Sequence, residues 1–317
     1  QAKEWLNLVE PLLSSGRAYR LPYGNADVIG AARQGRSSLL LTVKHAVDPS
    51  NPAAHLPLAI IDPAAELDNS SFKTLAKELS PSVILTCAAS VRKGVREDFG
   101  VKIVGLADTV RTSGHPQSNS DSQRRGMLLS QALLMTRESI PAVTLVTTVN
   151  DVQATAPVSW LHLQNLSTIL NGAKPGLHLP ESHAGNTILK DSWWQIQHDV
   201  GVDADGWSDL VGASPETASL TSAKFVSRTL SASLKDREAW ATDVMRPASE
   251  VIAGNGLVLH SASHFVMSSS RNEFPLTITN SLAQTVRVKV VVTSENPQRI
   301  DIPDTQVVAI QPKETQT

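Results

Sequence analysis

The sequence predicts an α/β fold: a degenerate β/α barrel of the TIM type, followed by an immunoglobulin-like β-sandwich. Short apolar strands alternate with helical segments through the first half of the chain. Helical spacing then dominates up to residue 252, and from residue 253 short strands alternate with turns rich in Ser, Asn and Pro. We therefore predict two domains, a barrel-like domain with a C-terminal helical region over residues 1–252 and a sandwich over residues 253–317.

The stretch over residues 17–35, RAYRLPYGNADVIGAARQG, predicts the first strand, turn and helix. Apolar and polar residues alternate over 19–23, and Pro22 and Gly24 end that strand. Residues 26–34 have helical spacing, with Gly35 placed to end the helix. Asn25 and Asp27 stand in the turn, where they either cap the helix or face a ligand, because ligands bind beyond the carboxyl ends of parallel strands.

The elements that follow continue the alternation. Residues 37–47 are apolar and ambiguous between helix and strand, and a helix is expected over 67–79 with Asp68 as its N-cap. Further strands are predicted over 56–62, 82–88, 101–106 and 142–149, and further helices over 3–14, 122–138 and 159–170. The polar stretch over 108–123 predicts a loop.

Two different patterns fill the last third of the chain. Helical spacing covers residues 193–200 and 218–244. Between them, VDADGWSD at 202–209 has the spacing of a calcium loop but lacks its closing Glu, so we expect a polar turn there. Strands follow over 257–260, 264–267, 274–279, 286–293 and 307–310. These 65 residues compare with roughly 100 in a full immunoglobulin-like domain, so we expect an incomplete sandwich.

Composition excludes several classes of function. The formal net charge is −2 and the Lys and Arg residues are scattered, so nothing indicates a nucleic-acid partner. Cys87 is the sole cysteine, which excludes a disulfide within the chain. The first residues have the character of the middle of a helix and no apolar run reaches the roughly 18 residues of a membrane span, so we expect a soluble segment excised from a longer protein.

Four acids are candidates for catalysis because each stands where a predicted strand ends: Asp27, Asp62, Asp108 and Asp151. A glycosidase needs two carboxylates that face each other about 5 to 10 Å apart across a cleft. Each acid has a structural alternative. Asp27 and Asp151 could cap helices, Asp62 could form an Asp-Pro turn, and Asp108 could begin a loop.

Metal chemistry has weaker support. A metal-dependent deacetylase needs an Asp pair and two histidines one helical turn apart, whereas His260 and His264, the closest in spacing, lie on predicted strands. We therefore predict no metal and no cofactor. Trp193 and Trp194, together with Tyr23, are candidate ligand-binding aromatics, because such rings stack on sugars or anchor a protein partner. The alternative is that the tryptophans pack a helix against the core.

Three stretches resemble one family of proteins. LPYGNADV at 21–28 is similar to the family pattern LPY-x-D-x-D-V, IDPAAELD at 61–68 to WP-x-x-G-x-LD, and PLTITNSLAQTVRVKV at 275–290 to the repeat PVTV-x-N-x-L-x-x-PV-x-V. The family comprises large envelope proteins of mycobacteria, corynebacteria and other actinobacteria. The chain departs from it in two places. Asn25 replaces the first acid of the D-x-D pair, and the second stretch lacks the Trp and the Gly.

The resemblance implies a cellular setting. Members carry a signal peptide, a large ectodomain and a C-terminal transmembrane helix, and their genes often lie beside that of the lipid II flippase. The implied location is the extracytoplasmic face of the cell membrane, in a parent protein anchored there. The implied partners are an envelope membrane protein, the lipid II flippase in particular, or cell-wall glycan. The family has no established activity, so the resemblance implies no reaction.

Two functions of different classes follow. The leading expectation is a non-catalytic binding or scaffold ectodomain in cell-envelope (peptidoglycan) assembly. The rival is a carbohydrate-active enzyme, either a glycoside hydrolase or a polysaccharide deacetylase, that uses Asp27 with one or more of Asp62, Asp108 and Asp151. An Asp27 that faces another acid across a cleft would favour the enzyme, and an Asp27 bonded to amides of its own helix would favour the scaffold.

Overall fold

The structure is a computed structural model of the whole chain. It describes residues 2–87, 91, 94–106, 121–137, 143, 145, 159–160, 162, 164–181, 191–231, 234, 236–252, 254–262, 264, 266, 269–270 and 272–317. The chain divides into two compact units. The first comprises residues 1–190 and 230–233, and the second comprises residues 191–229 and 234–317. The helices over 191–229 and 237–252 thus belong to the same unit as the C-terminal strands.

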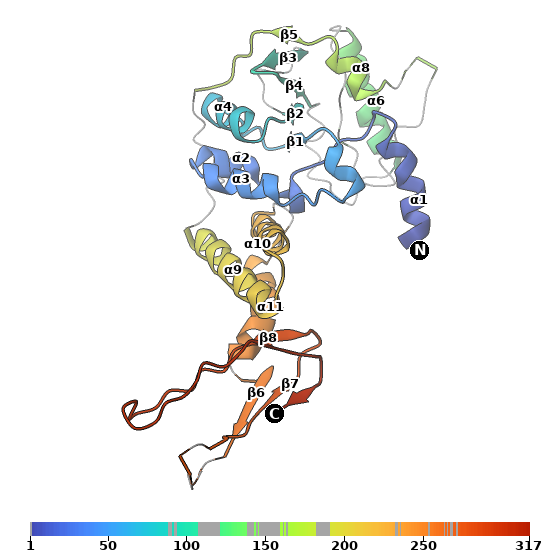
Figure 1. Cartoon of the computed structure of the whole chain (residues 1–317). Coiled ribbons are helices and arrows are strands. Elements are labelled where there is room, and N and C mark those ends of the chain that lie inside the picture. Colours follow the sequence, from blue (N-terminus) through green and yellow to red (C-terminus); the bar gives the residue numbers. More distant parts are fainter. Residues whose placement is uncertain are drawn as a thin grey trace. The chain divides into compact units, whose positions relative to one another are not determined.

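The first unit is built on a five-stranded sheet of mixed direction (Figure 1). Its strand order is β1-β2-β4-β3-β5, and β2 pairs in parallel with both β1 and β4. A single parallel bridge from Arg20 to Leu58 extends the sheet beyond β1. The strands are β1 (Ala59–Asp62), β2 (Val83–Thr86), β3 (Val95–Asp98), β4 (Val101–Gly105) and β5 (Lys174–Pro175).

Both faces of this sheet are buried, as the continuous apolar strands predict. Val83, Leu85 and Cys87 contribute to a core cluster on one face. Side chains alternate along a strand, so Ile60 and Ile84 point to the opposite face, where they are at most 2% exposed. The sheet is therefore a core element covered on both sides.

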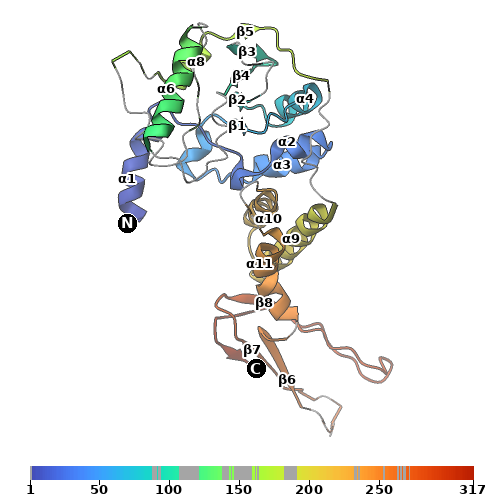
Figure 2. The same ribbon diagram turned by 180° about the vertical axis from the view of Figure 1, so that it is seen from behind.

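Helices connect and cover these strands. Both views place α2 and α3 on the β1 side of the sheet, with β5 at the opposite edge (Figures 1 and 2). Residues 37–47, ambiguous in sequence, form a helix. The helices are α1 (Ala2–Leu13), α2 (Val28–Arg33), α3 (Ser37–His45), α4 (Asn69–Glu78), α6 (Asp121–Arg137) and α8 (Leu166–Leu170), and Tyr23–Asn25 and Pro52–His55 form 3-10 turns.

Strand β3 is absent from the sequence expectations because its sequence, VRED, is mostly polar. It pairs antiparallel with β4 through a two-residue turn, Phe99-Gly100, in which both residues have positive φ values of 48° and 73°. Such tight hairpins are normally signalled by Asn-Gly or Asp-Gly, and a Phe at the first position hides the turn.

The second unit begins with three helices: α9 (Asp191–Leu210), α10 (Pro215–Thr229) and α11 (Arg237–Ile252). Gly212 follows the end of α9 by two residues, and the N–H of the next residue, Ala213, donates to Ser208 O at 2.9 Å. Gly212 has φ +65°, and the Arg287 side chain lies where a Cβ would stand. A glycine is therefore required at position 212, because its φ is positive and because the Arg287 side chain occupies the space of a Cβ.

Two small antiparallel sheets complete the second unit. One has the order β10-β7-β6 and the other pairs β8 with β9. The strands are β6 (Leu257–Ser261), β7 (Leu276–Asn280), β8 (Val286–Val288), β9 (Val308–Ile310) and β10 (Thr315–Gln316).

The predicted α/β class is confirmed: the chain combines helices with a largely parallel five-stranded sheet and two small antiparallel sheets. Within the described residues no closed barrel is shown, since β3 pairs antiparallel with β4 and β5 follows β3 as the last strand of the sheet. Across the same described ranges the C-terminal strands form one three-stranded and one two-stranded antiparallel sheet, and no complete immunoglobulin-like sandwich is shown. The strand predicted over 142–149 and the loop over 108–123 lie almost wholly outside those ranges. None of the helices described has the length and apolar character of a bilayer span.

Candidate functional site

The turn that carries Asn25 and Asp27 is ordered by backbone contacts. Asp27 N–H donates to Leu230 O at 2.8 Å, and Ala26 forms an antiparallel bridge with Ser231. Asn25 has φ 55° and its N–H donates to Pro22 O at 2.9 Å, so this residue closes a 3-10 turn and does not cap the helix.

Asp27 is the N-cap of α2. Its Oδ1 accepts the Gly30 N–H at 2.8 Å. Gly30 is part of this arrangement, because a Cβ there would lie 2.5 Å from Asp27 Oδ2. Tyr23, in the same turn, is 37% exposed. Asp27 thus caps its own helix, which is the structural alternative to a catalytic role. Asn25 and Tyr23 are the exposed polar and aromatic residues of the same turn.

Asp62 is buried and fully engaged at the end of β1. It is 2% exposed, and its Oδ1 accepts the Glu66 N–H at 2.9 Å. Its Oδ2 accepts the Leu67 N–H at 3.1 Å and the Thr86 hydroxyl at 2.6 Å. Thr86 is its register partner on β2. Asp62 therefore ties the β1–α4 loop to the next strand, which is a structural use of a carboxylate that was a catalytic candidate.

The same loop contains a strained residue, Ala65, with φ 58°. This left-handed conformation costs a residue with a Cβ roughly 1–2 kcal/mol, whereas glycine adopts it freely. Counted back from Leu67-Asp68, Ala65 is the position of the glycine in the family pattern that this stretch resembles.

We expect Ala65→Gly to raise the free energy of unfolding of the first unit by about 0.5–1 kcal/mol, because relief of the strained φ exceeds the entropy cost of glycine. Urea unfolding followed by far-UV circular dichroism measures this. Ala64→Gly is the matched control, because Ala64 does not have a positive φ; that variant should be destabilised. A loss of stability in Ala65→Gly would contradict the argument.

Two of the four candidate acids, Asp108 and Asp151, lie outside the described residues. Among the residues that the structure does describe, no cluster of three or more His, Cys, Asp or Glu side chains could hold a metal ion. The described part of the chain thus places one candidate acid as a helix cap and one as a buried loop anchor.

Among the residues that the structure describes, three ionisable groups have shifted pKa values, each with a local cause. Burial raises the pKa of the Tyr19 phenol and lowers the pKa of the Arg20 guanidinium, whose Nε donates to Leu56 O at 3.1 Å. Hydrogen bonds from its own backbone amide and from Ser214 lower the pKa of Glu216 in the first turn of α10. These shifts keep Tyr19 protonated and Glu216 charged at neutral pH, so neither group is prepared for proton transfer there.

Trp193 is held by a cation–π contact in the second unit. The Arg237 guanidinium carbon lies 3.8 Å from the centroid of the Trp193 ring, and Arg237 Nε donates to Thr229 O at 2.9 Å. Arg237 therefore joins the first turns of α9 and α11 to the end of α10. Trp194 and Trp193 are both half-buried. For Trp193 the packing alternative is thus realised, and its ring face is occupied by Arg237.

We expect Arg237→Ala to destabilise the second unit by about 1–2 kcal/mol, because it removes the cation–π contact and leaves the Thr229 carbonyl without this donor. Arg237→Lys keeps the charge but not the planar group, and should recover less than half of the loss. Thermal unfolding measures both variants, with Arg246→Ala on the exposed face of α11 as the control. Full stability in Arg237→Ala would show that the contact contributes nothing.

The stretch with calcium-loop spacing is helical, so the predicted polar turn is wrong. Residues 202–209 lie inside α9, and Val200, Ala204 and Ser208 are buried on one face of that helix at four-residue spacing. The apolar stripe outweighs the helix-weakening effect of the glycines. Asp205, the next residue after the buried Ala204, is exposed.

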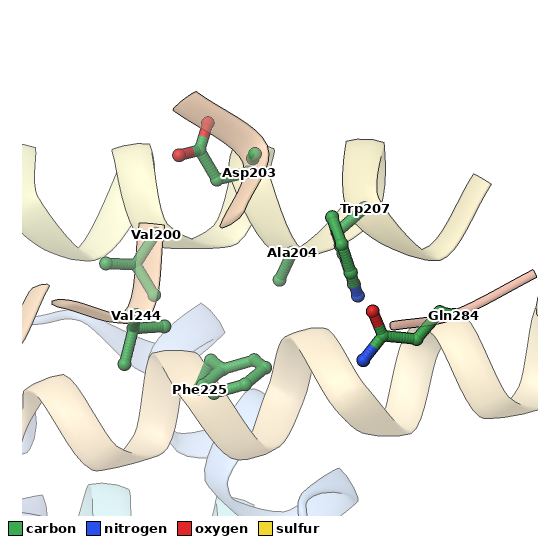
Figure 3. Close-up of a pocket in the computed structure, with 8 residues that line it drawn as sticks. Val200, Asp203, Ala204, Trp207, Phe225, Val244 and Gln284 are labelled. Carbon is green, nitrogen blue, oxygen red and sulfur yellow. The ribbon is translucent and has the colours of Figure 1, made fainter. Parts of the chain in front are cut away.

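The three helices form a partly open cavity that the sequence does not predict. It has a volume of about 180 Å³ and is lined by Val200, Asp203, Ala204, Trp207, Phe225, Val244, Ala248 and Gln284. Ala204 and Trp207 of α9 point to the side on which Phe225 of α10 lies, and Val244 of α11 lies beside Val200 (Figure 3). Gln284, in the β7–β8 turn, closes the end near Trp207.

A second, more open groove of about 630 Å³ lies between the two small sheets. Leu276 and Ile278 of β7 line one side, and Val288, Val308 and Ile310 of the other sheet line the facing side. Two antiparallel sheets thus turn apolar faces towards each other.

No protein-family model matches the chain, and a search of the curated proteins returns no match.

Proposed function

We propose that the chain is a non-catalytic binding or scaffold ectodomain that works in cell-envelope (peptidoglycan) assembly on the extracytoplasmic face of the membrane. The observation that carries the non-catalytic part is Asp62. Its two oxygens accept three hydrogen bonds at 2% exposure, so the carboxylate is committed to the β1–α4 loop and to Thr86 and is buried away from solvent. Asp27, the other described candidate, caps its own helix.

The proposal includes the finer architecture. The first unit is a degenerate β/α barrel, and residues 253–317 are an incomplete immunoglobulin-like module. In support, Arg20, β1, β2 and β4 are parallel neighbours in that order, and α4 connects β1 to β2, as in successive β/α units. The facing apolar sides of the small sheets are what an immunoglobulin-like module would bury.

The proposed partners are an envelope membrane protein, the lipid II flippase in particular, or cell-wall glycan. This part rests on the resemblance of three sequence stretches to the envelope family, and on no feature of the fold. The membrane anchor belongs to the parent protein in the same proposal.

Direct binding tests the proposal. The purified chain, as wild type and as Asp27→Ala, is titrated against the flippase in lipid nanodiscs, with empty nanodiscs as the control. Soluble muropeptides and polymeric peptidoglycan are titrated in parallel. Binding to the flippase or to glycan with equal affinity by both forms is the expected result. The absence of both interactions would contradict the proposed partners.

The same samples are assayed for release of reducing sugar and of acetate from peptidoglycan. Turnover by the wild type that is lost in Asp27→Ala, with unchanged far-UV circular dichroism, would replace the scaffold by a carbohydrate-active hydrolase. Unchanged turnover in Asp27→Ala would instead place catalysis on other residues, and would equally contradict the non-catalytic proposal.

A further inference from the structure

The cavity in the second unit results from small side chains where the helices meet. Ala204 of α9 and Ala248 of α11 both line it, and each leaves room that a leucine would fill. Val200, Ala204 and Trp207 face it from successive turns of α9, since they are four and three residues apart. The cavity is therefore bounded by regular helices and not by loops.

The neighbouring contacts hold these walls in place. At Gly201 a Cβ would lie 3.3 Å from Val226 Cγ2, so α9 and α10 approach closely beside the cavity. The Gln284 carbonyl accepts from Asn280 Nδ2 at 2.9 Å, which fixes the turn that closes the other end. Both walls are thus set by packing and hydrogen bonding that do not depend on a ligand.

The lining combines apolar surface with one charge. Trp207 and Phe225 contribute aromatic rings, and Asp203 contributes the only ionisable side chain of the lining that the structure describes. Asp203 is half-buried, and its carboxylate is turned away from the Phe225 ring, at the edge of the lining residues (Figure 3). An apolar group would therefore occupy the interior, and a positive charge attached to it would lie at the edge beside Asp203.

We propose that this cavity binds a small primary or quaternary amine whose apolar part is about the size of one six-membered ring, with the ammonium group paired to Asp203. The volume supports the size, because a dry cavity of about 150 Å³ in another protein takes up benzene. The charge supports the ammonium, because aromatic faces together with a carboxylate favour cations over neutral or anionic groups.

Benzylammonium is the probe, with benzyl alcohol as the neutral isostere and benzoate as the anion. Binding to the whole chain is followed by saturation-transfer NMR and isothermal titration. For eight heavy atoms we expect a Kd on the order of 1 mM for benzylammonium. Benzyl alcohol should bind about fivefold to tenfold more weakly, since the partly exposed charge pair contributes about one tenfold step at most, and benzoate should not bind.

Matched variants separate the charge from the cavity. Asp203→Asn should weaken benzylammonium binding about fivefold to tenfold and leave benzyl alcohol unchanged, whereas Asp205→Asn makes the same charge change on an exposed part of α9 and should alter neither. Ala248→Leu and Ala204→Leu fill the cavity from two different helices. Each should abolish the binding of both benzylammonium and benzyl alcohol. Thermal unfolding shows which of the two filled variants is folded.

Three results would overturn the proposal: no binding of benzylammonium by the folded wild type, equal loss of affinity in Asp203→Asn and Asp205→Asn, or undiminished binding in a folded, filled variant. Tighter binding of benzyl alcohol than of benzylammonium would also overturn the role of Asp203. The amine assay contains no flippase and no glycan, so it fails or succeeds independently of the envelope function.

Discussion

Asp62→Ala is expected to lower the free energy of unfolding of the first unit by about 3–5 kcal/mol, because it leaves a buried and a part-buried backbone amide and a buried hydroxyl without their acceptor, and an unpaired buried donor costs about 1–3 kcal/mol. Asp62 is 2% exposed and Thr86 is completely buried, so water cannot replace the lost acceptor without opening the loop. Asp62→Asn should recover little of the stability that Asp62→Ala loses, since the amide nitrogen of asparagine replaces one acceptor oxygen by a donor that faces other donors.

Urea unfolding measures this effect, and a double-mutant cycle with Thr86→Val isolates one bond of the network. Thr86→Val alone removes the hydroxyl donor and leaves both amide bonds to Asp62 in place. We expect Thr86→Val to lower the free energy of unfolding by about 1 kcal/mol. In the Asp62→Ala background the same exchange should lower it by less, because the acceptor of the hydroxyl is already gone.

The control is Asp98→Ala, which removes an exposed carboxylate that accepts the Phe99 N–H in the β3–β4 turn. It should cost less than about 1 kcal/mol. If Asp62→Asn instead retained full stability, its carboxylate would be dispensable for folding and a catalytic role for it would again be open.

The signals that predicted structure correctly are local. Asp68 was expected to cap the helix over 67–79, and it does: its Oδ1 accepts the Ser71 N–H at 2.7 Å while Ser71 Oγ accepts the Asp68 N–H at 3.1 Å. A capping box depends on residues three apart, so the sequence contains it whole. The same holds for Gly35, which ends α2 with φ 67°.

The features that the sequence leaves open or predicts wrongly depend on distant partners. The sequence leaves Asp62 open between catalysis and a turn, and the bond that ties it to the next strand comes from Thr86, 24 residues later in the chain. Residues 202–209 have the polar and glycine content of a turn, and become helical because Val200 and Ala204 pack against other helices. Tertiary burial outweighs local propensity in such cases.

The cavity could not be predicted for the same reason. Its lining comes from three helices and a turn, over a span of 85 residues from Val200 to Gln284. In sequence Ala204 and Ala248 are ordinary helix-forming residues, and nothing indicates that both line one cavity. The tryptophans were visible as candidates, but which of them contacts Arg237 and which lines the cavity depends on how the helices pack.

Asn280 is expected to be the corresponding anchor of the second unit, and Asn280→Ala should cost about 3 kcal/mol, because a completely buried amide with four bonds is removed. Its Nδ2 donates to the carbonyl oxygens of Gln284, Ile310 and Gln311 at 2.9, 3.0 and 3.0 Å. Its Oδ1 accepts the Leu282 N–H at 3.0 Å. One side chain thus joins β7, the β7–β8 turn and the end of β9.

This arrangement explains the third stretch of the family resemblance in physical terms. The Asn and Leu of PLTITNSLAQTVRVKV are Asn280 and Leu282. Leu282 packs so closely on Gly256 that a Cβ there would lie 2.7 Å from Leu282 Cδ2. The pattern therefore describes a turn whose amide is buried and whose leucine is inserted against the preceding segment.

Asn280→Asp distinguishes this account from simple loss of volume. The aspartate has nearly the same shape but places an oxygen where Nδ2 meets three carbonyl oxygens, so it should destabilise the second unit more than alanine does. Urea unfolding compares the two variants, with Thr279→Ala as a neighbour on the same strand that should cost less than about 1 kcal/mol. If Asp and Ala were equally destabilising, the donors of Asn280 would contribute nothing beyond packing. Because Gln284 lines the cavity from the turn that Asn280 holds, a folded Asn280→Ala variant should also bind benzylammonium more weakly, which connects the stability of this turn to the proposed site.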